Sequence, residues 1–164
     1  MITVYLALGS NIGDSRANID QAVRLLGSAV QQIKQAPLYT SKAVGYTDQP
    51  DFLNTAISGH TDLDPKTILE FIGKAERQVG RTASFRWGPR EIDIDIIFYG
   101  DQVLKTDNLT IPHPSFRERD FVLQPLKDLD PALKDPVSGQ TVQQLLNKID
   151  TSRRSIIKKI DGKA

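Results

Sequence analysis

The chain has 164 residues with a formal net charge of +1, and 39% of them are hydrophobic and 25% charged. These values are close to those of ordinary globular proteins, so they exclude a disordered or fibrous chain and leave no overall charge to attract nucleic acid or an anionic membrane. The absence of cysteine excludes disulfides, thiolate metal ligands and a cysteine nucleophile. We expect one domain, residues 1–164, because a chain of this length buries about two thirds of its unfolded surface in a single core.

The first residues, MITVYLALGSNIGD, carry none of the features of a secretory signal peptide. They have no cationic start and no long apolar run before the first glycine. No stretch of the chain reaches the roughly eighteen consecutive apolar residues that a membrane-spanning helix requires. We therefore predict a cytoplasmic, monomeric protein whose partners are small molecules rather than nucleic acid or a membrane.

The first half of the chain alternates segments of strand and helix character. β-Branched, aromatic and aliphatic residues predict strands at 3–8, within 30–44 and at 51–59. Ile19, Ala22 and Leu26 recur at helical spacing, and Asp14 or Ser15 can cap the start of this helix. A second helix is predicted at about 65–79, where a proline stands at the entry and an apolar stripe follows.

The second half begins with the basic loop GRTASFRWGPR, residues 80–90, and the alternating strand EIDIDIIFYG, residues 91–100. We expect a hairpin partner for this strand at 102–104. The segment LTIPHPSFRERDFVLQPL predicts a loop leading into a short helix, and the tail from about Thr141 predicts another short helix and a basic end. The order β-α-β-β-α-β favours an α+β fold, a ferredoxin-like antiparallel sheet with helices packed on it.

The strand EIDIDIIF is predicted to have one apolar and one acidic face, because side chains alternate along a strand. The apolar face would hold Ile92, Ile94, Ile96 and Phe98, and the acidic face Glu91, Asp93 and Asp95. Two carboxylates about 5 Å apart repel by roughly 3 kcal/mol at an effective dielectric constant near 20, and a divalent cation removes this cost. We therefore predict that Asp93 and Asp95 bind Mg²⁺, which prefers oxygen ligands. The alternative is a solvated strand face paired with Lys or Arg across the sheet.

Basic residues flank the acidic strand on both sides. Arg81, Arg86 and Arg90 precede it, and arginines beside an acidic metal site indicate a phosphate ligand, because a guanidinium group binds phosphate oxygens bidentately. An ordinary basic loop paired with the acidic residues is the alternative. Downstream, His113 stands between two prolines that restrict its backbone, and Arg119 follows in the same segment.

Three aromatic residues, Phe52, Trp87 and Phe121, lie at predicted loops or strand edges rather than in a periodic core stripe. They could stack on a planar ligand, although core packing is the commoner role of a single Phe. The turn GSNIGD does not predict a phosphate-binding loop, because it lacks the Lys and Ser or Thr that reach phosphate and magnesium. His60, at the end of a predicted strand, is interpreted as structural.

Several motifs occur in a characteristic order: ALGSNIGD, GYTDQPDFLN, the Glu76 to Arg81 step, RWGPREIDIDIIFYG and IPHPSFRERDFVLQPL. Together they resemble the 6-hydroxymethyl-7,8-dihydropterin pyrophosphokinase family of folate biosynthesis over nearly the whole chain. The resemblance implies transfer of pyrophosphate from ATP to the pterin hydroxymethyl group, which yields AMP. It also implies that Asp93 and Asp95 hold two Mg²⁺ ions.

The same resemblance implies roles for individual residues. Catalysis is implied for Arg81, Arg90, Asp93 and Asp95, and nucleotide binding for Arg81, Arg90, Ile96, Thr110, His113 and Arg119. Pterin binding is implied for Ser41, Val44, Phe52, Asn54, Trp87 and Phe121. In YTSKAVG, Ser41 replaces the threonine usual in the family and a proline is lost, but the hydroxyl that would contact the pterin is retained.

Two other functions use some of the same features. A two-metal phosphodiesterase or nuclease would use the Asp pair to activate water. A ferredoxin-like RNA-binding module would need a basic surface and exposed strand aromatics, and the sequence has neither pattern.

Overall fold

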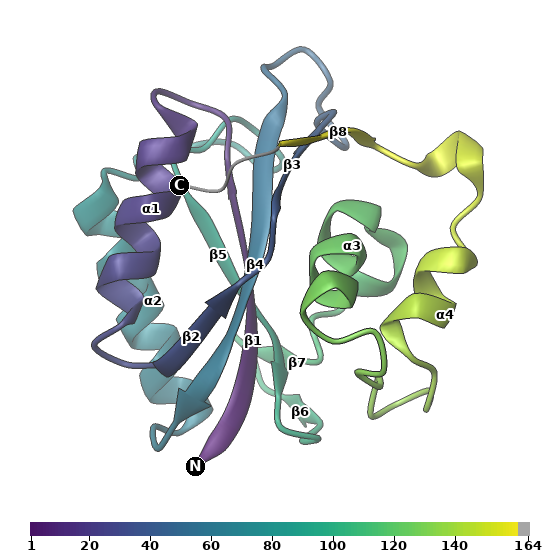
Figure 1. Cartoon of the computed structure of the whole chain (residues 1–164). Coiled ribbons are helices and arrows are strands. Elements are labelled where there is room, and N and C mark those ends of the chain that lie inside the picture. The colour runs from purple at the N-terminus through teal and green to yellow at the C-terminus, as the bar shows by residue number, and fades with distance from the viewer. Residues whose placement is uncertain (161–164) are drawn as a thin grey trace.

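The computed structural model describes residues 1–160 and contains an antiparallel sheet with helices on both faces (Figure 1). Its strands are β1 (Ile2–Ser10), β2 (Gln31–Gln35), β3 (Leu38–Ser41), β4 (Phe52–Thr61), β5 (Asp93–Tyr99), β6 (Leu104–Lys105), β7 (Thr110–Ile111) and β8 (Ile156–Ile160). Its α-helices are α1 (Ser15–Leu26), α2 (Pro65–Val79), α3 (Asp120–Leu129) and α4 (Val142–Asn147). Two 3₁₀ turns, η1 (Phe116–Glu118) and η2 (Thr151–Arg153), precede α3 and β8.

The main sheet has the strand order β5-β1-β4-β3-β8, and β2 also pairs with β4. Within residues 30–44 the predicted single strand is therefore two strands, which pair with different parts of β4: Lys34 lies opposite Ser58 and Tyr39 opposite Asn54. Pro37 lies between them and has no N–H to donate to the sheet. With β2 and β3 counted as one interrupted strand, the first four positions follow the ferredoxin-like order, which confirms the predicted fold class.

The fifth strand of this order, β8, was not predicted. It pairs antiparallel with β3, with Leu38 opposite Ile160 and Ser41 opposite Ile156. The segment IIKKI does not alternate strictly between apolar and polar residues, so its sequence carries only the weak signal of a basic tail. The partner strand, more than a hundred residues earlier in the chain, decides its conformation.

Helices α1 and α2, both predicted from their apolar patterns, cover one face of the sheet (Figure 1). Asp14 caps α1 by accepting a hydrogen bond from the Ala17 N–H at 3.1 Å, and Asp64 caps α2 in the same way from Thr67 at 2.8 Å. The apolar stripes of the two helices pack on alternate residues of the strands. This core contains Val4, Leu6, Ile19, Leu26, Ile57, Ile68, Ile72, Ile92, Ile94 and Ile96.

Helices α3 and α4 cover the opposite face, where a second core is formed. Phe98 belongs to this second core, packed edge-on against Phe116 at 5.1 Å between ring centroids, so its predicted place beside Ile96 is wrong. The register explains the error, because Leu6 pairs with Ile96 and Tyr5 with Phe98, which leaves Ile97 as an extra residue. Such a bulge reverses the alternation for all residues beyond it.

The predicted hairpin after β5 is also wrong. Residues 104–105 form β6, which pairs with β7 in a separate two-stranded sheet, with Leu104 opposite Ile111. The long neighbour of β5 is β1. His60 lies in β4 and is hydrogen-bonded to the Thr3 hydroxyl on β1 at 3.2 Å, which agrees with a structural role.

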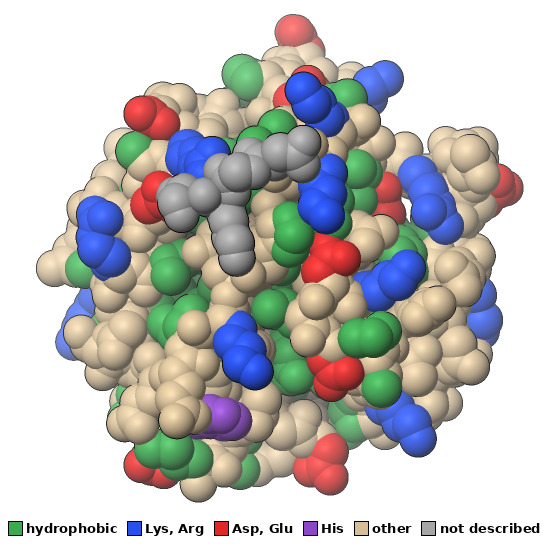
Figure 2. All heavy atoms as spheres, viewed as in Figure 1, with side chains coloured by type: hydrophobic (Ala, Val, Ile, Leu, Met, Phe, Trp, Pro, Cys, Tyr) green, Lys and Arg blue, Asp and Glu red, His purple; other side chains and the backbone are tan. Residues whose placement is uncertain are grey.

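The surface matches the balanced composition. On the face seen in Figure 2, Lys and Arg side chains are scattered among acidic ones rather than gathered in one patch. None of the helices within residues 1–160 has the length and apolar composition needed to span a bilayer.

Asp135 anchors the connection between α3 and α4 and makes the fold sensitive to acid. Its fully buried carboxylate accepts two hydrogen bonds from Arg117, at 2.6 and 2.9 Å, and others from the Ser138 hydroxyl and the Val137 N–H. Burial alone would raise the pKa of Asp135, but the hydrogen bonds, led by that of Arg117, outweigh it and lower the pKa to about 2.

We expect Asp135→Asn to lower the free energy of unfolding at neutral pH by roughly 2 kcal/mol, because the depressed pKa reflects stabilisation of the ionised form. This stabilisation is complete above the unfolded-state pKa of about 4 and is lost as the pH falls through about 2. Urea unfolding of both proteins across this range provides the test. A difference that stays constant down to pH of about 2 would contradict the assignment.

Candidate active site

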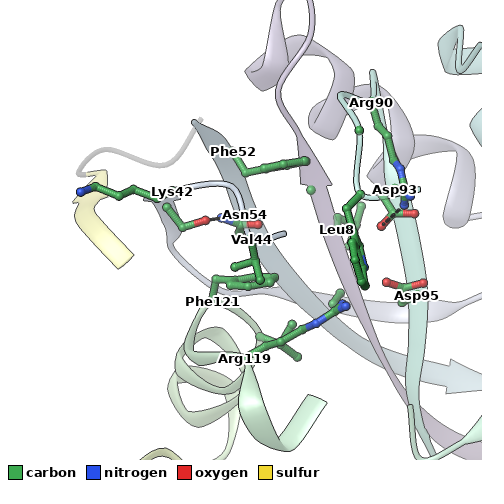
Figure 3. Close-up of a pocket in the computed structure, with 16 residues that line it drawn as sticks. Leu8, Lys42, Val44, Phe52, Asn54, Arg90, Asp93, Asp95, Arg119 and Phe121 are labelled. Carbon is green, nitrogen blue, oxygen red and sulfur yellow. Dashed lines mark hydrogen bonds and ion pairs between the residues drawn. The ribbon is translucent and has the colours of Figure 1, made fainter. Parts of the chain in front are cut away.

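A pocket lies where the ends of β1, β3, β4 and β5 meet the start of α3 (Figure 3). It is lined by Ala7, Leu8, Gly9, Ser41, Lys42, Val44, Phe52, Asn54, Trp87, Gly88, Arg90, Asp93, Asp95, Arg119, Phe121 and Val122. In the view of Figure 3, acidic and aromatic side chains occupy opposite sides of this pocket. The pocket therefore combines a charged subsite with an apolar one.

Asp93 is the centre of the charged subsite. Its Oδ1 lies 3.1 Å from Arg81 Nη1, and its Oδ2 lies 3.2 Å from Arg90 Nη1. The two guanidinium groups come from the loop before β5, so the arginines and the acid predicted to share a ligand are already neighbours. Their opposite charges compensate each other.

Glu76, on α2, stabilises the contact between Arg81 and Asp93 by two hydrogen bonds. Its Oε2 accepts hydrogen bonds from Arg81 Nη1 at 2.8 Å and from the Ile94 N–H at 2.9 Å. Burial raises the pKa of Glu76, while the Ile94 hydrogen bond and the Arg81 charge oppose this rise. One carboxylate thus ties an arginine to the strand that carries Asp93 and Asp95, because both hydrogen bonds end on the same oxygen.

Asp95 lies deeper on the same strand face, and Arg119 points towards it (Figure 3). Burial, followed by repulsion from Asp93, raises the pKa of Asp95 to about 7, against the opposing charge of Arg119. His113 Nε2 lies 3.9 Å from Asp95 Oδ2. Burial and the charge of Arg119 lower the pKa of His113 to about 4, so its imidazole is neutral at physiological pH and this contact is not an ion pair.

The apolar subsite contains a buried polar side chain, Asn54, between two aromatic rings. Phe52 and Asn54 lie on β4 and Phe121 in the first turn of α3, and in the view of Figure 3 the two rings lie above and below Asn54. The Asn54 amide is 4% exposed and donates a hydrogen bond to the Ser41 hydroxyl at 2.7 Å. This combination suits a flat ligand whose edge carries hydrogen-bonding groups.

Two loops close over the pocket and are joined to each other. Asn11, in the turn after β1, donates hydrogen bonds to the Gln49 side chain and the Pro50 carbonyl, and its Oδ1 accepts one from the Arg90 N–H at 2.8 Å. Gln49 in turn donates to the Trp87 carbonyl at 2.7 Å. The loops before β4 and before β5 are therefore connected through one pair of amides.

Trp87 has a positive φ of 61°, which is uncommon for a residue with a side chain, and half of its surface is exposed. Its ring packs on Gly45, where a Cβ atom would lie 2.9 Å from ring carbons. Gly45 itself has a φ of 86°. A glycine is needed there for both reasons, and the close approach holds Trp87 beside the pocket.

The pocket brings together most of the residues predicted to form the site. Those that line it are Ser41, Val44, Phe52, Asn54, Trp87, Arg90, Asp93, Asp95, Arg119 and Phe121. Arg81 and His113 contact the acidic pair without lining the pocket. The Ile96 side chain is buried in the core under α1 and α2, and Thr110 lies in β7 opposite Lys105.

Sequence reasoning missed four residues with polar side chains that support or line the pocket: Asn11, Lys42, Gln49 and Glu76. Three of them stand within motifs that were recognised, in ALGSNIGD, in GYTDQPDFLN and at the start of the Glu76 to Arg81 step. A single polar residue gives no periodic signal. Each motif therefore indicated that its segment belongs to the site, but not which role this side chain has. The fourth, Lys42, stands within YTSKAVG, where only Ser41 and Val44 were given roles.

The donor set fits a magnesium ion that is shared with a ligand. Among residues 1–160 no group of three or more His, Asp or Glu side chains is placed to hold a metal by itself. Mg²⁺ commonly takes one or two carboxylates and completes its coordination with water and substrate phosphates. Asp93 and Asp95 on one strand face, both open to the pocket, supply that number of carboxylates.

Comparison with known proteins gives a consistent result. The family model of 7,8-dihydro-6-hydroxymethylpterin-pyrophosphokinase matches residues 5–131. The 2-amino-4-hydroxy-6-hydroxymethyldihydropteridine pyrophosphokinase of Aquifex aeolicus is 44% identical over 144 residues, covering 88% of this chain and 90% of the relative. The enzyme of the same name from Bacillus subtilis is 42% identical over 143 residues, covering 85% and 86%.

A solved structure supports the fold. The wild-type HPPK-DHPS of Plasmodium falciparum with pterin and p-hydroxybenzoate superposes with a TM-score of 0.72 over 90% of this chain and 41% of that one. At 17% sequence identity this likeness concerns the fold alone.

An acidic pair with arginines and an aromatic subsite in one pocket, on a ferredoxin-like sheet, fits an enzyme that transfers a phosphate-type group to a flat small molecule. The chain belongs to the 7,8-dihydro-6-hydroxymethylpterin-pyrophosphokinase family. It is a pyrophosphokinase of folate biosynthesis with ATP as its co-substrate, and none of the relatives named above is a nuclease.

Proposed function

We propose that the apolar subsite binds 6-hydroxymethyl-7,8-dihydropterin and that the charged subsite binds the phosphates of ATP. The observation that carries this assignment is the position of Asp93 and Asp95 across one pocket from Phe52 and Phe121. A pterin held between the two rings would present its hydroxymethyl group towards the acids. The products are then AMP and the pterin pyrophosphate.

Asp93 and Asp95 would hold two Mg²⁺ ions, which supply charge neutralisation and orientation of the transferred phosphate groups. In the ligand-free protein the two oxygens of Asp93 contact Arg81 and Arg90 instead. Phosphate offers these guanidinium groups an equivalent anionic partner. Arg81 and Arg90 would therefore turn from the carboxylate to the phosphates when ATP binds, and their charge would stay compensated.

The remaining predicted nucleotide contacts differ in charge. Arg119 carries a permanent charge into the pocket, whereas the neutral His113 offers a hydrogen bond without a charge. Because the Ile96 side chain is buried in the core, its contact with the nucleoside would come from its backbone, and that of Thr110 from its backbone or hydroxyl.

In the pterin subsite, Asn54 and Ser41 would recognise the hydrogen-bonding edge of the ring. Their mutual hydrogen bond at 2.7 Å orients the Asn54 amide before the ligand arrives, which reduces the entropy lost on binding. Val44 and Trp87, both about half exposed, would cover the other side of the ligand. Catalysis then depends mainly on positioning, since no side chain near Asp95 is placed as a strong general base.

We further propose that the chain is one domain, acts as a monomer in the cytoplasm, and has no nucleic-acid or membrane partner. The support for a single domain is the shared sheet, whose two faces carry both cores and whose last strand comes from the C-terminal segment.

The deciding experiment incubates the protein with ATP, Mg²⁺ and the hydroxymethyldihydropterin and identifies the nucleotide product. We expect AMP, formed only when the pterin is present and abolished by chelation of the metal. ADP or inorganic phosphate as the main product, or AMP formed equally without the pterin, would contradict the proposal. Incubation with a linear DNA and a phosphodiester substrate tests the nuclease alternative, for which we expect no cleavage.

A further inference from the structure

Asp120, at the start of α3, is a buried carboxylate without a cationic partner among its hydrogen-bond donors. It is 2% exposed and accepts three hydrogen bonds, all from one short segment near the C-terminus. The donors are the Ser155 N–H at 2.9 Å, the Ser155 hydroxyl at 2.7 Å and the Ile156 N–H at 2.9 Å. Together they fasten the first residue of α3 to the beginning of β8.

The same segment is fastened to the other side of the pocket. The Ser155 carbonyl accepts a hydrogen bond from the Lys42 N–H at 2.9 Å, and Ile156 pairs with Ser41 across the edge of β3. Lys42 and Ser41 both line the pocket. Ser155 therefore bonds through its N–H and hydroxyl to α3 and through its carbonyl to the segment that follows β3.

Asp120 stands between two residues that line the pocket, Arg119 just before α3 and Phe121 in its first turn. Asn54, whose amide donates a hydrogen bond to the Ser41 hydroxyl, lies next to Phe121 in the view of Figure 3. The spacing between the Phe121 ring and the Ser41–Asn54 pair is thus set by a bridge that runs through Ser155. The middle of this bridge, Ser155 and Ile156, lies outside residues 5–131, which the family model matches, whereas Asp120, Ser41 and Lys42 lie inside them.

We propose that Asp120 is a positioning residue for the pterin, which acts through Ser155 to hold the two walls of the apolar subsite at a fixed separation. The proposal rests on the proposed function, because it takes the apolar subsite to be the pterin site. Asp120 contacts no reacting group. Its effect is larger on the pterin than on ATP, because the bridge joins Phe121 to Ser41 and Lys42, whereas of the nucleotide site only Arg119 adjoins Asp120 and the acidic pair is carried by β5 at the other edge of the sheet.

Asp120→Asn tests the proposal directly. An amide oxygen can still accept from the Ser155 and Ile156 N–H groups and the amide NH₂ can donate to the Ser155 hydroxyl, but three charge-assisted hydrogen bonds become neutral ones, which are about half as strong. We expect the KM for the pterin to rise about ten-fold, equivalent to about 1.4 kcal/mol of binding free energy, while the KM for ATP stays within about two-fold. Ser155→Ala removes only the hydroxyl donor, and we expect the same direction with a rise of about three-fold.

Asp135→Asn is the matched control, since it also removes a buried, hydrogen-bonded carboxylate, but one whose partners do not line the pocket. We expect it to lower the melting temperature without changing either KM. Equal changes in both KM values for Asp120→Asn, or equal kinetic effects of Asp120→Asn and Asp135→Asn, would overturn the proposal.

If Asp120→Asn does not fold, Ser155→Ala decides, and an unchanged pterin KM in that variant would also overturn the proposal. The wild-type protein is assayed first with ATP, Mg²⁺ and the pterin. Absence of AMP there would refute the proposed function itself, whereas wild-type activity with unaltered variants would refute only the role of Asp120.

Discussion

Asp95→Ala is expected to lower turnover by about 10³-fold or more while leaving the protein folded, because a group that stabilises transition-state charge contributes about this much. Asp95 faces the pocket, where it has a distant contact with the neutral His113 and the charge of Arg119 only partly offsets its burial, so its removal does not destabilise the fold. It also relieves the repulsion between Asp95 and Asp93. In the presence of a chelator, the melting temperature of the variant should equal or exceed that of the wild type.

The control for this variant is Glu91→Gln, which changes another acid of the same short segment. Glu91 accepts hydrogen bonds from Thr82 and is assigned no metal. We expect turnover to stay within a few-fold of the wild type. Loss of cooperative unfolding in Asp95→Ala would show a structural role instead, and equal loss of turnover in both variants would refute the assignment of the metal to Asp93 and Asp95.

Arg81→Ala is expected to slow the chemical step by about 10² to 10³-fold and to change pterin affinity by less than about three-fold. The guanidinium group is held by Glu76 and Asp93 on the charged side of the pocket and makes no contact with the aromatic subsite. Single-turnover measurements separate the rate of AMP formation from the dissociation constant of the pterin, which is measured by quenching of Trp87 fluorescence.

Two further variants make this result specific. Arg81→Lys should not restore the rate, because an ammonium group cannot hold a phosphate bidentately. Arg77→Ala removes an exposed arginine in the last turn of α2, four residues earlier, and should leave both quantities unchanged. Similar losses of rate and of pterin affinity in Arg81→Ala would contradict the separation of the two subsites.

Local sequence patterns were sufficient to predict much of this fold. The apolar stripe of α2 and the turn residues at its entry predicted its limits, Pro65 to Val79, and one of the two cap residues proposed for α1, Asp14, is the one that bonds Ala17. These features depend on neighbours within four residues, which the sequence contains directly. The alternation of β5 likewise placed Asp93 and Asp95 on one face, opposite the apolar residues from Ile92 to Ile96.

The site could be predicted less fully than the fold. The motifs identified its segments, while the roles of individual residues remain predictions. Phe52 and Phe121 are 69 positions apart, and only the folded chain brings them to one pocket. The motif around Glu76 was recognised, yet its carboxylate was given no role, since its partners Arg81 and Ile94 lie in other elements.

The acidic pair on one face of β5, with which the prediction of a metal site began, was determined by the sequence alone, because alternation along a strand is a local property. Three features were decided only by tertiary structure: the bulge at Ile97 that turns Phe98 to the second core, the engagement of Asp93 by Arg81 and Arg90, and the bridge from Asp120 to Ser155. Each depends on a pairing between segments distant in the chain. The free energy of such a pairing depends on both segments, so the local sequence of either segment does not specify it by itself.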